Sequence, residues 1–252
     1  MKKNSLILFL LSCIIFISCE KKQSDFPIEN KYWTVEDYQN VVREIRFSEN
    51  SDHRVLPTFD DPELKIVIEK LTDQENFKIV LEDKELGLKH RNEVAQGFFD
   101  VWNDMNELYS VRDKTDKFVY ENEMIAVYNF GLGLQLNYFK LGNEELAADS
   151  DDPNSSNVQN MILMNQNTLV RNYSFYLDEI NNESAYSENG ISKIADGIDT
   201  YFTELVTNNP KADYTEMLDK ITLLQKKAKS ERIKKSLSNL STLINSKKVK
   251  EV

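Results

Sequence analysis

Residues 124–138 read Met-Ile-Ala-Val-Tyr-Asn-Phe-Gly-Leu-Gly-Leu-Gln-Leu-Asn-Tyr, and this stretch decides the fold class of the chain. From residue 130 onward, apolar residues alternate with small or polar ones, which is typical of a β-strand. The apolar segment as a whole covers 118–141, however, which is far longer than an ordinary strand. Length therefore favours a buried helix, whose two glycines let a neighbouring helix approach closely.

Clear helix-start signals lie nearer the N-terminus. Thr34 is placed to cap a helix whose third residue is Asp37, and Trp33 and Tyr38 are spaced to pack across that start as a hydrophobic staple. Farther along, Asp61-Pro62-Glu63 supplies a cap, a proline at the first helical position and an acid that suits the helix dipole. Both patterns predict helices.

Helical spacing of apolar residues continues through most of the chain, over about 88–112, 157–181 and 190–207 and then in two further helices up to 246. The segment 73–86 stays ambiguous between a short strand and a helical turn. Seven glycines and five prolines leave few turn points, which argues against a many-stranded sheet. We therefore expect an all-α fold, a bundle of about seven or eight helices in two packed layers.

The first nineteen residues have the pattern of an export signal, with Lys2 and Lys3 before an apolar run at 6–17. That run is twelve residues long, whereas a membrane-spanning helix needs roughly 20. The tetrapeptide Phe16-Ile17-Ser18-Cys19 resembles the lipobox of bacterial lipoproteins, with Phe16 where leucine is usual. Bulky Phe16 also disfavours an ordinary signal-peptidase cut after Ser18.

The lipobox resemblance implies that residues 1–18 are removed as a signal peptide and that Cys19 becomes the lipid-anchored first residue. Acyl chains such as palmitate on a thioether and on the amino terminus would hold the protein to a membrane, because two or more chains give stable anchoring. The expected location is the bacterial cell envelope, on the periplasmic or surface face of a membrane, with the outer membrane favoured.

The mature chain divides into a tether and a domain. Residues 19–31 are polar and predict a flexible tether, followed by a helical domain at 32–252. An acidic stretch, 142–156, is expected to link two halves of this domain, 32–141 and 157–246. No thiol remains for a disulfide, a zinc site or a nucleophile once Cys13 is removed and Cys19 is acylated.

Charge is very unevenly placed in this acidic chain, whose formal net charge is −11. Residues 220–252 carry ten Lys or Arg against two Glu, and we call them the basic segment. Its candidate binding residues are Lys226, Lys227, Lys234 and Lys235. They could be solvated, face anionic lipid or an acidic partner, or dock on the acidic body of the protein. Nucleic acid is not an expected partner.

His90 and Glu93 are the one candidate metal pair, because they share a face of a predicted helix. The run Gly87-Leu88-Lys89-His90-Arg91-Asn92-Glu93 resembles the Gly-x-His-x-x-Glu motif of imelysin-type metal binders, with one extra residue after the glycine. The flanking Lys89 and Arg91 disfavour a cation, so a surface helix with a local charge pair is the favoured interpretation. We expect no cofactor.

Two groups of side chains could line a ligand groove. The first is an aromatic stripe that favours a core role with hydroxyls at the surface, and it comprises Trp102, Tyr109, Tyr128, Tyr138, Tyr173, Tyr176 and Tyr201. The second is an amide-rich run that predicts either a buried amide network or the edge of a groove, and it includes Asn160, Asn165, Gln166, Asn167 and Asn172.

Function is only weakly constrained by these patterns. The sequence contains no phosphate-binding glycine loop, nucleophile elbow or two-histidine zinc helix, so an enzyme is not the favoured class. We expect a lipid-anchored envelope protein that binds a partner protein or ligand without catalysis. One alternative is an immunity-type inhibitor of a toxin, because strong acidity suits a basic partner. Another is a metal binder or enzyme that uses His90 and Glu93.

Overall fold

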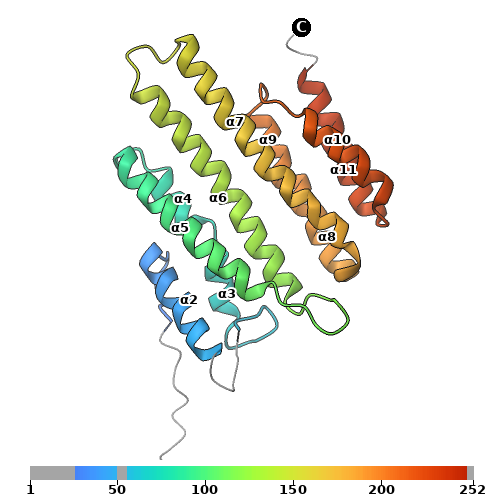
Figure 1. Cartoon of the computed structure of the whole chain (residues 1–252). Helices are drawn as coiled ribbons and strands as arrows, with labels where there is room; N and C mark the ends of the chain where they lie inside the picture. The colour runs from blue at the N-terminus through green and yellow to red at the C-terminus, as the bar shows by residue number, and fades with distance from the viewer. Residues whose placement is uncertain (1–25, 50–55, 249–252) are drawn as a thin grey trace, which may run out of the picture.

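The computed structural model describes residues 26–49 and 56–248, and these form an all-α bundle (Figure 1). The predicted fold class is therefore confirmed. Among the described residues, strand-like pairing is limited to a single bridge between Arg112 and Phe118. The ambiguous segment 73–86 is helical at 75–81 and forms turns on either side.

In the described residues, five helices precede the crossing to the second half of the bundle. In order they are α2 (Val35–Glu49), α3 (Lys65–Leu71), α4 (Glu75–Leu81), α5 (Leu88–Tyr109) and α6 (Glu121–Ala148). The second half continues with α7 (Ser156–Tyr176), η1 (Leu177–Ala185), α8 (Glu188–Gly197), η2 (Ile198–Phe202), α9 (Thr203–Asn208), α10 (Thr215–Lys227) and α11 (Glu231–Lys248).

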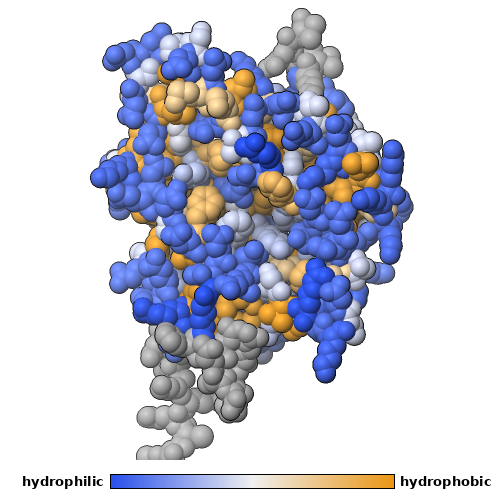
Figure 2. Space-filling model, in the orientation of Figure 1, coloured by the Kyte–Doolittle hydropathy of each residue, from blue (hydrophilic) through white to orange (hydrophobic). Residues whose placement is uncertain are grey.

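The helices pack in two layers. Figure 1 shows α2, α5, α6, α7 and α10 side by side, with α3, α4, α8 and α9 behind them, and α11 packs on α10 and α8. The buried apolar side chains of both halves form one continuous core. The face seen in Figure 2 is mostly hydrophilic, with hydrophobic side chains in separate patches.

The stretch that decides the fold lies in α6, the longest helix of the described residues. Every residue from Phe130 to Leu136 is buried, because α5 packs on one side of the helix and α7 and α8 on the others. A helix buried on all sides needs no polar face and therefore lacks the usual helical period. This burial explains why its sequence resembles an alternating strand.

Gly131 confirms the expected role of the α6 glycines. A Cβ atom at Gly131 would lie 2.2 Å from the Trp102 indole on α5, which is closer than real contacts allow. The indole Nε1 of Trp102 donates a hydrogen bond of 2.9 Å to the Val127 carbonyl oxygen on α6. The missing side chain thus makes room for this close contact between the two helices.

The predicted start of the first helix is confirmed atom by atom. The backbone N–H and Oγ1 of Thr34 donate to Asp37 Oδ2 at 2.8 and 2.9 Å, and the Asp37 N–H donates back to Thr34 Oγ1 at 3.2 Å. The rings of Trp33 and Tyr38 meet edge to face, with centroids 5.7 Å apart. The second predicted start is wrong in position: Asp61 Oδ1 accepts the Glu63 backbone N–H at 2.8 Å, but residues 62–64 form a turn and the next helix begins only at Lys65, after Leu64.

Two expected boundaries need correction. The end of the predicted tether, residues 26–31, packs on the domain: Trp33 Nε1 donates to the Pro27 carbonyl oxygen at 2.9 Å, and Lys70 Nζ donates to the carbonyl oxygens of Asn30 and Lys31. Residues 19–25 lie outside the described residues. The predicted linker 142–156 is helical as far as Ala148, so the connection spans only 149–155.

The helix expected near 190–207 is continuous from 188 to 208 but contains the π-helical turn η2 between α8 and α9. A π-turn holds more residues per turn than the helix around it, and it therefore rotates the side chains that follow relative to those that precede. Such turns are rare and frequently lie at functional sites.

Candidate functional site

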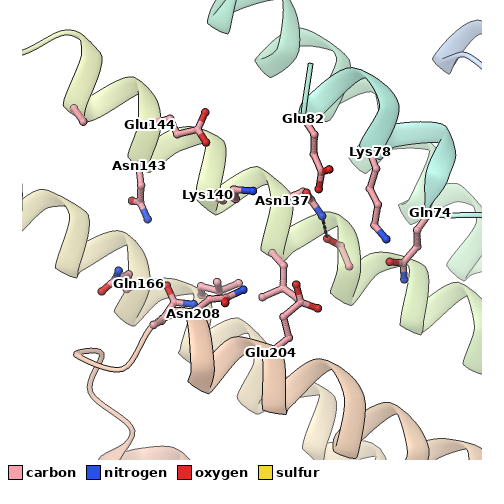
Figure 3. A pocket seen from close by; sticks show the side chains of 15 residues that line it. Gln74, Lys78, Glu82, Asn137, Lys140, Asn143, Glu144, Gln166, Glu204 and Asn208 are labelled. Atoms are coloured by element: carbon pink, nitrogen blue, oxygen red, sulfur yellow. Dashed lines mark hydrogen bonds between the residues drawn. The ribbon is translucent and has the colours of Figure 1, made fainter. Parts of the chain in front are cut away.

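A groove of about 630 Å³ opens between α4, α6, α7 and α9 (Figure 3). This volume lies within the range of small-molecule binding sites. Its lining combines charged, amide and apolar side chains from all four helices. The lining residues are Gln74, Lys78, Glu82, Gly133, Leu136, Asn137, Lys140, Asn143, Glu144, Ala147, Gln166, Leu169, Glu204, Asn208 and Asn209.

Helical spacing explains how each wall presents several polar groups together. On α4 and its flanks, Gln74, Lys78 and Glu82 recur every four residues, and Glu204 and Asn208 have the same spacing at α9. On α6 the lining positions recur every three or four residues from Gly133 to Ala147. Leu136 and Leu169 are buried and supply apolar surface within the groove.

Some of the amide side chains are fixed by the protein itself. Gln74 Nε2 donates to the Asn129 carbonyl oxygen at 3.0 Å and to the Tyr201 hydroxyl at 2.6 Å. Asn137 Nδ2 donates to the Gly133 carbonyl oxygen at 3.0 Å. Gln74 also packs against Gly133, where a Cβ atom would lie 2.4 Å from its Oε1. These contacts give one end of the groove a defined shape.

Other polar side chains of the groove have no protein partner. Within the described part of the chain, the side chains of Glu82, Lys140, Gln166, Glu204 and Asn208 make no hydrogen bond or ion pair. Figure 3 shows Lys78 and Glu82 extending from the α4 side and Glu204 extending from α9 toward the same space. Glu82 and Glu204 are therefore available to a ligand, whereas Lys78 Nζ also faces Glu75 Oε1 at 3.5 Å.

The π-helical turn η2 adjoins the groove. Its Tyr201 accepts the hydrogen bond from Gln74, and α9, which follows directly, carries Glu204 and Asn208. Burial raises the pKa of the Tyr201 hydroxyl, and the hydrogen bond from Gln74 opposes that shift. The π-helical turn η2 thus connects the end of the groove where Gln74 is hydrogen-bonded to the wall formed by α9.

The candidate metal pair lies elsewhere, on the exposed surface of α5. His90 and Glu93 are both exposed, and Glu93 faces Lys89 Nζ at 3.9 Å. In 26–49 and 56–248, no group of three or more His, Cys, Asp or Glu residues could hold a metal ion. The placement agrees with the surface-helix interpretation.

The four candidate lysines of the basic segment do not line the groove. Lys226 and Lys227 are exposed in the last turn of α10, Lys235 is exposed on α11, and Lys234 pairs with Glu231 at 2.7 Å within α11. The ion pairs that join this segment to the body use other cations. Arg232 contacts Asp196 and Asp199 at 2.5 and 2.8 Å, and Lys220 contacts Asp178 at 2.9 Å.

The aromatic stripe does not form the groove either, because none of its seven residues lines it. Tyr109 and Tyr173 are fully buried, and their hydroxyls donate to the carbonyl oxygens of Pro57 and Leu132 at 2.8 and 2.7 Å. The expected core role is thus confirmed for these two. The expectation that their hydroxyls reach the surface is wrong.

The amide-rich run supplied the one sequence signal for the groove. Gln166 lines it, whereas Asn165 Nδ2 donates to Asn143 Oδ1 at 3.2 Å and Asn167 Oδ1 accepts the Asp213 N–H at 2.7 Å. The run therefore divides between a groove edge and local amide bonding. Sequence reasoning missed the rest of the lining, whose members are far apart in the chain.

Comparisons with models of protein families, with curated proteins and with solved structures find no match to this chain. Among the described residues, no helix combines the length and the apolar character required to span a membrane. Cys19 and His53 lie outside the described residues.

Proposed function

We propose that this protein is a non-enzymatic binding protein of the bacterial cell envelope and that lipid on Cys19 attaches it to a membrane. We propose further that it holds a small polar ligand in the groove between α4, α6, α7 and α9. The observation that carries the ligand-binding proposal is the set of unpartnered polar side chains converging on the groove from three helices and the end of α4.

Two features support the groove over other hollows of the surface. Some of its amide side chains are hydrogen-bonded to the protein and give the groove a fixed shape. Others make no such bond among the described residues, and they offer donors and acceptors to a ligand. A π-helical turn lies at its edge, and such turns are rare and frequently lie at functional sites.

A pair of neighbouring alanines near the end of α6 tests the groove while the ligand is still unidentified. Ala147 lines the groove, whereas Ala148 is exposed. The wild-type chain, Ala147→Trp and Ala148→Trp are each incubated with the small-molecule fraction of a bacterial envelope extract, and bound compounds are identified by native mass spectrometry. We expect a compound on the wild type and on Ala148→Trp that is lost from Ala147→Trp. Equal retention by both variants would place binding elsewhere, and no retained compound would count against the proposal.

The anchor proposal rests on the lipobox resemblance and has its own test. Metabolic labelling with a fatty acid should mark the wild-type protein and leave Cys19→Ala unlabelled, because the thioether and the processed amino terminus both depend on that cysteine. Label that persists on Cys19→Ala would overturn the lipoprotein assignment.

A further inference from the structure

We infer that the ligand of the groove is a short peptide in zwitterionic form, held through its amino and carboxylate groups and its peptide bonds. This inference rests on the proposed binding function and names the ligand class of the same site. It follows from three properties of the lining: its mixed charge, its amide content and the absence of aromatic rings.

Mixed charge selects against ligands of a single sign. A polyanion would meet Glu82, Glu144 and Glu204, and a polycation would meet Lys78 and Lys140. A zwitterion satisfies both sets, because its carboxylate can approach a lysine while its ammonium approaches a glutamate. Lys140 and Glu204 are the best placed for these roles, since they come from different walls and neither has an ion-pair partner in the described residues.

Amide side chains match the peptide group. Asn and Gln each carry a donor and an acceptor, as a peptide bond does, so they can bond both of its polar atoms. Gln166 and Asn208 carry amides without protein partners in the described part of the chain, and Asn137 Oδ1 stays free because the bond to Gly133 uses only its Nδ2. A bound peptide would thus meet amides along its length.

The lining argues against a sugar. No aromatic side chain is among the described residues that line the groove, and Tyr109 and Tyr173 of the aromatic stripe are buried in the core instead. A sugar ring therefore finds no flat apolar face on which to pack. Leu136 and Leu169 offer apolar surface that suits an aliphatic side chain of a peptide.

Calorimetry with defined probes tests this inference on the purified full chain. The first probe is a pool of tetrapeptides built from Ala, Asn and Leu with free termini, so that charge resides only at the two ends. The second is the same pool acetylated and amidated, and the third is a pool of neutral oligosaccharides of similar size. We expect the free peptides to bind and the capped peptides to bind at least tenfold more weakly, because each charge-assisted hydrogen bond contributes about a factor of ten or more.

Paired variants assign the two ends of the peptide. Lys140→Gln and Glu204→Gln should each weaken binding of the free tetrapeptides about tenfold and have no effect on the capped ones. Lys235→Gln and Glu93→Gln, which change exposed charges outside the groove, should leave binding unchanged.

Equal affinity for free and capped peptides, preference for the oligosaccharides, or no binding of any pool would each overturn the peptide inference. The paired Trp variants at Ala147 and Ala148 separate this failure from that of the proposed function. If a compound from the extract still depends on an open groove, the groove binds a ligand and only the assigned class is wrong.

Discussion

The aromatic cluster and the groove share helices α4 and α6, and they differ in whether their polar groups have partners within the protein. The aromatic cluster comprises Trp33, Tyr38, Phe77, Phe98 and Phe130. Phe77 on α4 packs in the cluster while the next residue, Lys78, lines the groove. On α6, Phe130 belongs to the cluster and Asn137 to the groove. The same helix thus contributes to the packed cluster at one position and to the groove at another.

Hydrogen bonding in the aromatic cluster is fully internal. Asn76 is buried beside it, where its Oδ1 accepts the Trp33 N–H at 2.7 Å and its Nδ2 donates to the Tyr38 hydroxyl and the Lys70 carbonyl oxygen at 2.8 and 2.9 Å. In the groove, by contrast, the amides of Gln166 and Asn208 have no partner among the described residues. Satisfied polar groups stabilise the fold, whereas unpartnered ones can contribute to binding.

Alkaline pH should produce the largest effect, which is loss of the whole fold. Burial raises the pKa of Tyr128 to about 12 and also raises the pKa of Tyr38 and Tyr173, whereas a tyrosine in the unfolded chain titrates near 10. Stability is therefore intact below about pH 10 and falls as pH rises from there toward 12, because only the unfolded chain releases these protons.

Absorbance at 295 nm and circular dichroism, recorded together from pH 8 to 12, measure this effect. Ionisation of the buried tyrosines should coincide with loss of the helical signal. If all tyrosines ionise near pH 10 while the helix content stays unchanged, their burial does not contribute to stability in the expected way.

Phe98→Ala should destabilise the protein more than any single substitution in the groove. Phe98 is buried and its ring contacts those of Tyr38, Phe77 and Phe130, so its removal leaves a cavity in the aromatic cluster. We expect a loss of about 3–5 kcal/mol in the free energy of unfolding, measured by urea denaturation. The matched control is Phe175→Ala, because Phe175 is 63% exposed and should change stability by less than about 1 kcal/mol.

Gly131→Ala should have an intermediate effect. The added methyl group would overlap the Trp102 indole, and α5 and α6 would have to separate. Overpacking of this kind costs about 1–3 kcal/mol and should lower the melting temperature. Gly87→Ala serves as the control, since a Cβ atom there meets nothing within 4 Å. Equal melting temperatures for the two variants would show that the close approach of α5 and α6 is not required.

Groove substitutions should have the smallest effect on stability. Gln166→Ala and Asn208→Ala remove side chains without partners in the described part of the chain, so each should change the free energy of unfolding by no more than about 0.5 kcal/mol. Asn76→Ala, an amide change of the same kind beside the aromatic cluster, should cost about 1–3 kcal/mol. Similar losses at all three positions would contradict the division of roles between the two regions.

Local signals made much of the fold predictable from sequence. Thr34 and Asp37 are three residues apart, so a short motif determines the helix start, and a single long apolar run predicts α6. The ends of elements were less predictable, because α6 continues through residues 142–148, where Glu144 pairs with Arg91 and Glu145 accepts a hydrogen bond from Asn92 on α5. The packing of residues 26–31 on the domain likewise depends on Lys70, which is distant in sequence.

The groove was largely unpredictable for a related reason. Lys78, Asn137, Gln166 and Asn208 come together only when α4, α6, α7 and α9 pack, and each alone resembles an ordinary polar surface residue. The π-helical turn at 198–202 also leaves no sequence pattern of its own among the regularly spaced apolar residues around it. Only the amide-rich run around Gln166 indicated a groove edge.

The most direct test of peptide binding in the groove is the movement of side-chain amide signals on ligand addition. The proton–nitrogen correlation spectrum of the protein is recorded while tetrapeptides with free termini are added. We expect saturable shifts for the side-chain amides of Asn137, Gln166 and Asn208, with no shift for Asn76 in the aromatic cluster. Shifts confined to residues outside the groove, or a spectrum that does not change at millimolar peptide, would contradict peptide binding in the groove.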